Sequence, residues 1–211
     1  MTSRSPKASG HRQRGPQLKI DAVDIDAVDD EWFDVDDDEL SGEHAALIDV
    51  VRGSARSWPA CPPSETAVLL FSPEEAADDS GSGANDGHAS YDVATARAFA
   101  DGKSVLVLIV DLSDPVKNLL LRTLGATVAG DRLFCGERDD TTYRPQPSED
   151  VEPLESTGSP EELGHIAAAW FEEIVRRPVI APPGRGPAYF VTPGAALPAG
   201  HRWVRNGPAA V

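Results

Sequence analysis

Two aspartates and a serine follow one another at the end of the most apolar stretch of the chain. Asp111 lies at the end of a predicted buried strand, 104–112, and Ser113 and Asp114 come directly after it. In open parallel sheets, ligands bind outside the carboxyl ends of the strands, so an acid at this place can hold Mg²⁺, accept a proton or accept a phosphoryl group. The structural alternative, which we favour, is that Asp114 caps a helix and Asp111 is a solvated acid.

Three other groups contain residue types that occur in functional sites. Gly102-Lys103-Ser104 resembles the end of a phosphate-binding loop, but it stands between a predicted helix and a predicted strand, the reverse of the required order. Glu162 and His165 have the E-x-x-H spacing of di-iron sites, which need two such pairs and two further glutamates. For Cys135 we favour a buried structural thiol over a nucleophile, because nothing in the sequence brings it near a histidine. We therefore expect no metal and no cofactor.

The elements that would position these residues form a predicted α/β core over about 60–135. Apolar runs and turn signals predict the following order: strand 66–71, loop 72–89, helix 91–101, strand 104–112, a helix that begins at Asp114-Pro115 and ends at Gly125, and strand 131–135. The buried stripe of the second helix is predicted to be Val116, Leu119, Leu120 and Leu124. The order β-α-β-α-β predicts a small three-stranded parallel sheet, with strand 104–112 at its centre and helices packed on it.

Two further helices flank this predicted core. The first spans 42–57 with Ser41 as its N-cap, and the second spans about 160–176. Ser159 and Glu162 have the spacing of a capping box around a proline at the first helical position. The second helix has a wide apolar face, so we expect it to pack on the core. Two strand-like runs close the chain and predict a loose hairpin: 188–192 and 201–204.

Charge divides the chain into segments. Residues 1–19 carry five basic and no acidic side chains, whereas residues 20–43 carry twelve acidic and no basic ones. Mutual repulsion among these acids and the polar start predict that residues 1–40 are disordered. The predicted segments are a disordered arm 1–40, an α/β core with its leading helix 41–136, an acidic Pro/Ser-rich linker 137–159, and a C-terminal helix and hairpin 160–211.

Three apolar side chains in the acidic segment stand out because that segment is too charged to have a core of its own. They are Trp32, Phe33 and Leu40. Alternation of acidic and hydrophobic residues is typical of disordered interaction segments. We therefore predict that residues 20–40 contact another protein and that these three side chains bind it.

Composition excludes several classes of function. A net charge of −16 makes direct binding of nucleic acid unfavourable. The longest apolar run, 105–110, is too short to span a membrane, and the basic start lacks the apolar stretch of a signal peptide. The two distant cysteines predict reduced thiols, and we expect a cytoplasmic protein, with an arginine-rich composition typical of a high-GC bacterium.

Three functional hypotheses remain open from the sequence. The first is a non-enzymatic accessory or interaction protein that uses the acidic-aromatic N-terminal segment. The second is a small α/β enzyme or nucleotide- or phosphate-binding module with its site at Asp111, Ser113 and Asp114. The third is an acidic mimic of nucleic acid that occupies the basic groove of a DNA-binding protein. The sequence favours the first because it contains no complete catalytic constellation.

Overall fold

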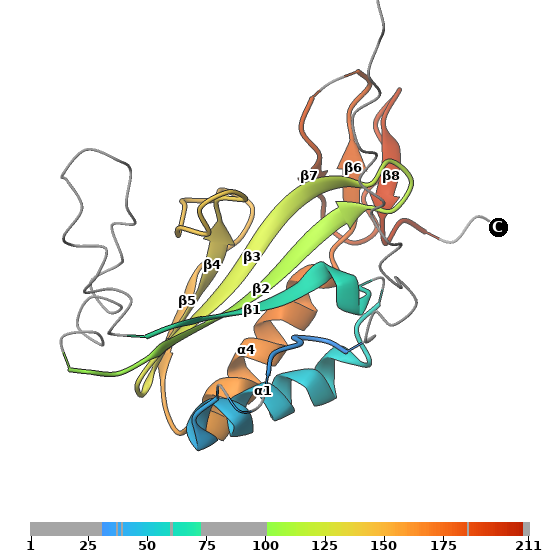
Figure 1. The fold of residues 1–211 in the computed structure, drawn as a ribbon. Helices are drawn as coiled ribbons and strands as arrows, with labels where there is room; N and C mark the ends of the chain where they lie inside the picture. The colour runs from blue at the N-terminus through green and yellow to red at the C-terminus, as the bar shows by residue number, and fades with distance from the viewer. Residues whose placement is uncertain are drawn as a thin grey trace, which may run out of the picture.

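The structure is a computed structural model that describes residues 31–36, 38, 40–59, 61–72, 101–184 and 186–208. In these residues a five-stranded sheet, in the order β1-β2-β3-β4-β5, is covered on one face by two helices (Figure 1). A second sheet of three short strands, in the order β7-β6-β8, lies beside the far end of the long hairpin that β2 and β3 form.

The described elements alternate little between helix and strand. Their bounds, in chain order, are α1 Gly42–Ala55, the 3-10 helix η2 Pro63–Glu65, β1 Thr66–Phe71, β2 Val105–Asp114, β3 Leu119–Ala129, β4 Arg132–Arg138, β5 Leu154–Thr157, α4 Pro160–Val175, β6 Val179–Ala181, β7 Tyr189–Phe190 and β8 Arg202–Arg205. The predicted loop 72–89 and helix 91–101 lie, apart from Ser72 and Asp101, outside the described residues.

The predicted parallel sheet is wrong, because every strand pair in the described part of the chain is antiparallel. β1 and β2 pair from Thr66 opposite Val110 to Phe71 opposite Val105. Nor is β2 the central strand, because β3 occupies the middle of the five. Apolar runs identify buried strands in either direction, and the β-α-β-α-β order that argued for parallel strands depended on a second helix that does not form.

That second helix, predicted to begin at Asp114-Pro115, is replaced by a tight turn and the strand β3. Asn118, with a φ of 51°, closes the turn, and Leu119 begins the strand. Val116 is 84% exposed instead of buried. Asp114 was predicted to cap a helix, but an aspartate can cap a turn in the same way. Its carboxylate accepts backbone hydrogen bonds from the turn, as it would at a helix start.

Gly125, predicted as the end of that helix, lies in the middle of β3 for a packing reason. A Cβ at this position would lie 2.6 Å from Nε of Arg138, whose side chain lies over Gly125. Arg138 is buried and donates a hydrogen bond to the Thr127 hydroxyl (2.5 Å). The glycine therefore provides room for a buried arginine, which a sequence-based interpretation cannot distinguish from a helix terminator.

The two helices were predicted correctly. The Ser41 hydroxyl accepts a hydrogen bond from the His44 N–H (3.2 Å) at the start of α1, and Ser159 and Glu162 form the capping box of α4. The helices pack against each other and against one face of the sheet. The buried apolar residues between them come mainly from α1, α4 and the helix-facing side of β2 and β3: Leu47, Ile48, Val51, Leu163, Ala167, Phe171, Leu106, Leu108, Val110, Leu124 and Ala126.

The predicted C-terminal hairpin is also wrong. β7 and β8 are present, but each pairs with β6 and not with the other. β6 has only three residues and follows α4 after Pro178, so its apolar signal is too short to identify from the sequence. The range predicted as a linker, 137–159, contains the end of β4 and all of β5. No helix in the described part of the chain is both long enough and apolar enough to cross a bilayer.

Candidate interaction surface

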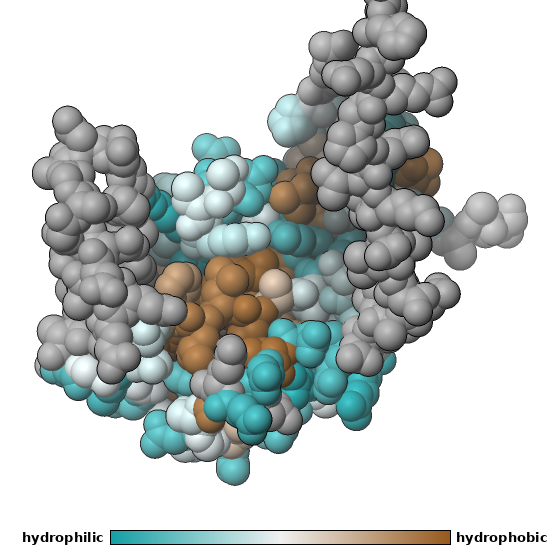
Figure 2. Space-filling model, in the orientation of Figure 1, coloured by the Kyte–Doolittle hydropathy of each residue, from teal (hydrophilic) through white to brown (hydrophobic). Residues whose placement is uncertain are grey.

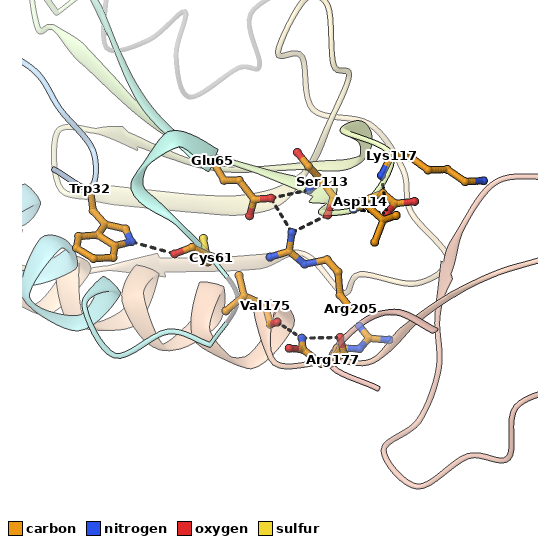
Figure 3. Close-up of polar contacts among 11 residues, drawn as sticks. Trp32, Cys61, Glu65, Ser113, Asp114, Lys117, Val175, Arg177 and Arg205 are labelled. Atoms are coloured by element: carbon orange, nitrogen blue, oxygen red, sulfur yellow. Dashed lines mark hydrogen bonds and ion pairs between the residues drawn. The ribbon is translucent and has the colours of Figure 1, made fainter. Parts of the chain in front are cut away.

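The three residues predicted as a chemical site lie near one another, but they take part in structural hydrogen bonds. Asp114 is 1% exposed, and its carboxylate accepts a hydrogen bond from the Arg202 guanidinium. It also accepts hydrogen bonds from the backbone of the turn, where Figure 3 labels Lys117. Asp111 accepts a hydrogen bond from the Thr123 hydroxyl on the neighbouring strand (2.6 Å). Asp114 therefore joins the β2–β3 hairpin to β8 of the second sheet.

Ser113 contributes its backbone to a second buried link. Its N–H donates to the Glu65 carboxylate (3.0 Å), and its carbonyl accepts from the Arg205 guanidinium (2.8 Å), as Figure 3 shows. Glu65 and Arg205 form an ion pair of 2.7 Å. Arg205 is 4% exposed, so this pair lies inside the protein and its loss would leave an uncompensated buried charge.

The electrostatics of Asp114 fit this structural role. Burial by itself would raise the pKa of the carboxyl group, but the hydrogen bond and charge of Arg202, with the backbone donors of Val116 and Lys117, lower the pKa below its usual value of 3.8. The carboxylate is thus ionised at neutral pH and already engaged. It is poorly suited to act as a general acid, and its acceptor sites for a cation are partly occupied.

Several arginines that the sequence interpretation passed over organise these contacts. Arg122 lies between the carboxylates of Glu137 (3.2 Å) and Asp150 (3.0 Å). Arg202 and Arg205 come from the final strand. For Arg202 and Arg205 the available sequence signal was the net positive charge of the last 47 residues. These two arginines pair with acids earlier in the chain, Asp114 and Glu65.

The predicted partner-binding side chains Trp32 and Phe33 contact the protein's own core. Phe33 is fully buried, with its ring 6.0 Å from the Trp58 ring and 6.1 Å from the Phe171 ring. Trp32 is half-buried and donates its indole N–H to the Cys61 carbonyl (3.1 Å). Leu40, the third predicted residue, is half-buried and packs against the core as well. A role for these three residues in partner binding stays a prediction.

Backbone contacts fix this segment beside the start of β1. The Phe33 N–H donates to the Thr66 hydroxyl (2.8 Å), and the Arg52 guanidinium donates to the carbonyls of Trp32 (3.3 Å) and Phe33 (3.1 Å). Arg52 also forms an ion pair with Glu31 (3.7 Å). The acidic segment therefore reaches the sheet at the first residue of its edge strand.

That edge strand is the most notable surface feature of the described residues. β1 reads Thr-Ala-Val-Leu-Leu-Phe, without a charge, a proline or a glycine, and each of its six residues is only half-buried. Among the described residues it pairs with β2 alone. Figure 2 shows an apolar patch over this strand and the part of the sheet beside it. Natural proteins usually protect such an edge with charge, proline, a bulge or a covering segment.

Two cavities in the described part of the chain have weaker features of a binding site. A cavity of about 370 Å³ near the start of α1 has Lys103 on its lining but also Glu43 and Asp131, so its charge is mixed. His44 also lines it; the Nδ1 atom of this buried imidazole has no hydrogen-bond partner among the described residues, and burial lowers the pKa of the ring below 6.5 despite the opposing effect of Glu43. A smaller cavity of about 280 Å³ lies against Trp32, Arg52 and Arg56.

The predicted absence of a metal site stays a prediction, but the geometry of its candidates can be stated. The Glu162 carboxylate accepts hydrogen bonds from the Ser159 N–H and hydroxyl, and His165 is exposed. In the part of the chain that the structure describes, no three His, Cys, Asp or Glu side chains gather as a metal site would require. Cys61 and Cys135 are buried free thiols, and burial raises the pKa of each to about 12.

Comparison of the sequence with protein-family models finds no match, and searches of curated proteins and of solved structures find none either.

Proposed function

We propose that this protein is a non-enzymatic accessory protein that acts in the cytoplasm by binding another protein, with the acidic segment 20–40 as part of the contact. The observation that supports this most is a juxtaposition: the acidic segment reaches the sheet at Thr66, where the uncharged edge strand β1 begins. An apolar surface beside a group of like charges has the composition of a protein-binding site, in which the apolar part provides affinity and the charges direct approach.

The charged part of this surface is exposed. Four acids of the segment are described; Asp34, Asp36 and Asp38 are all on the surface, and Glu31 is exposed and forms an ion pair with Arg52. Their field, added to a net charge of −16, would accelerate encounter with a positively charged protein and would be weakened by salt. We therefore expect a partner with a basic surface and an association rate that falls as ionic strength rises.

Affinity capture with matched variants tests this proposal. The full chain is compared with a triple variant, Asp34→Asn, Asp36→Asn and Asp38→Asn, and with a control that removes two exposed acids elsewhere, Glu161→Gln and Glu173→Gln. A partner should be retained by the full chain and the control, lost with the triple variant, and bind again as a purified protein. Failure to recover any protein that distinguishes the triple variant from the control would contradict the proposal.

The enzyme hypothesis has less geometric support, because it relied on a parallel sheet with a ligand crevice at Asp111. Mg²⁺-nucleotide titration of the full chain would revive it if binding occurs and Asp111→Asn abolishes that binding with the fold intact. The nucleic-acid mimic differs from the main proposal in its partner, and competition between this protein and DNA for one DNA-binding protein would favour it.

A further inference from the structure

We propose that the outer edge of β1 is a strand-addition site for an extended, apolar segment with basic flanks that belongs to a partner protein. This inference rests on the proposed binding function and names the place and the chemistry of the contact. In strand addition, a partner segment pairs with the exposed edge of a sheet: backbone hydrogen bonds provide affinity, and alternate side chains provide specificity.

The backbone of β1 has the groups that such a contact requires. In an antiparallel pair, successive residues alternately direct their N–H and C=O groups toward and away from the neighbouring strand. β1 pairs with β2 in unbroken register from Thr66 to Phe71. Alternate residues between Thr66 and Leu70 therefore direct their backbone groups to the edge opposite β2. Among the described residues no strand lies on that edge.

The side chains of β1 extend apolar surfaces on both faces of the sheet. Ala67 and Leu69 pack against a buried apolar cluster that includes Val107 and Ile109, on the face opposite the helices. Val68 and Leu70 pack against the main core on the helix-covered face. An added strand would continue both surfaces, so its residues should be apolar on both sides near the middle. Each β1 residue is half-buried, and it would lose part of its remaining exposure when the strand binds.

Charge decides between the three kinds of occupant. Residues 1–19 of the same chain are basic, but two prolines and two glycines interrupt them and they contain few apolar side chains, so they do not fit an apolar strand. A second copy of this chain would bring another net charge of −16, and residues 20–30 of the same chain carry five aspartates without a basic residue. Either would meet the exposed acids Asp34, Asp36 and Asp38 close to the start of β1. Like charges in such proximity oppose association, whereas basic flanks on an added strand would be attracted. The electrostatics therefore favour a basic partner segment.

A defined peptide tests the site directly. The probe is a fluorescent peptide of about ten residues, a length typical of a strand, with alternating valine and leucine in the middle and two lysines at each end. The first control peptide has the same residues with N-methyl groups on every backbone nitrogen of its middle part, which removes the donors on both edges. The second control peptide replaces the lysines by glutamates. Binding is measured by anisotropy with the full chain, and amide hydrogen exchange locates the contact.

Two substitutions in the protein complete the design. Leu69→Lys places a charge on the edge strand, and Leu119→Lys places the same charge on the β2–β3 hairpin, where Leu119 is 57% exposed and away from β1. We expect Leu69→Lys to weaken binding of the lysine-flanked peptide by about tenfold or more and Leu119→Lys to leave it within about twofold. The peptide should slow exchange of alternate amides within 66–70 in the unsubstituted chain, a readout that does not depend on how well a variant folds.

Four results would overturn the inference: equal binding of the N-methylated peptide, equal binding of the glutamate-flanked peptide, loss of binding when residues 1–30 are removed, and a dimer in solution that Leu69→Lys dissociates. The third would mean that the peptide contacts the acidic arm, and the fourth that a second copy occupies the edge. If the peptide experiments fail while a captured partner still depends on Asp34, Asp36 and Asp38, the strand-addition site is wrong and the proposed function stands.

Discussion

Replacement of Phe33 by alanine tests whether the end of the acidic segment belongs to the folded core. The ring is fully buried and has the rings of Trp58 and Phe171 as neighbours at 6.0 and 6.1 Å. Truncation of a buried phenylalanine to alanine costs about 3–5 kcal/mol, which includes the cavity that remains. We expect a loss in this range, because Thr66 and Arg52 hold the backbone of residue 33 in place and limit collapse around the cavity.

This free energy corresponds to a large shift in melting temperature. For a domain of this size each kcal/mol lowers Tm by about 2–4 °C, so Phe33→Ala should lower it by roughly 6–20 °C. Urea unfolding followed by circular dichroism gives the free energy directly. Asp34→Ala is the matched control: the next residue is exposed, and its substitution should change stability by less than about 0.5 kcal/mol.

A loss of less than about 1 kcal/mol for Phe33→Ala would refute the reasoning. It would mean that residues 31–36 do not pack in solution as the structure places them, and that Phe33 is available to a partner in the free protein. A second measurement tests whether the whole segment 31–40, and not the Phe33 ring alone, stabilises the core. Removal of residues 1–30 should leave the melting temperature nearly unchanged, whereas removal of residues 1–40 should lower it at least as much as Phe33→Ala does, because Trp32 and Leu40 also pack against the core.

Three further results are expected. Trp170→Ala should lower the free energy of unfolding in urea by about 3–5 kcal/mol, because the indole is 7% exposed and donates to the Glu152 carbonyl. An unchanged free energy would mean that α4 does not unfold together with the sheet. Burial lowers the pKa of His44, so the contribution of the neutral imidazole to the free energy of unfolding should be complete above pH 6.5 and decrease as the pH falls below it. His44→Leu should make the free energy of unfolding less dependent on pH in this range. Cys61 and Cys135, with pKa values of about 12, should react with iodoacetamide at pH 8 only after unfolding; rapid labelling of the native protein would contradict their burial.

The sequence by itself determined the helices α1 and α4 and the approximate location of three strands, β1, β2 and β4. Ser41 and the pair Ser159 and Glu162 define helix starts through contacts that span only three residues, so neighbours along the chain suffice to specify them. The apolar runs at β1 and β2 likewise mark chain segments that must be covered on both faces. Such local signals depend little on the rest of the fold.

Tertiary structure alone decided the direction of the strands and the fate of residues 115–124. The hydrophobic pattern of a buried strand does not indicate whether its neighbours are parallel or antiparallel. A stretch rich in leucine is compatible with the apolar pattern of a helix and with that of a strand. The turn at Asn118 and the room that Gly125 leaves for Arg138 select the extended form, and both depend on pairing with β2 and β4. These contacts join residues that the sequence does not show to be neighbours.

The sequence likewise showed the types of the predicted site residues, whereas their surroundings were decided by the tertiary structure. The sequence shows the residue types of Asp111, Ser113 and Asp114, but their hydrogen-bond partners come from β3, η2 and β8. Through these partners Ser113 and Asp114 connect the first sheet to the second. The acidity of the N-terminal segment indicated an exposed Phe33, whereas Thr66 and Arg52 draw it into the core. Local composition sets what a side chain can do, and long-range packing sets which of those roles remains available, because burial and pairing depend on residues far away in the chain.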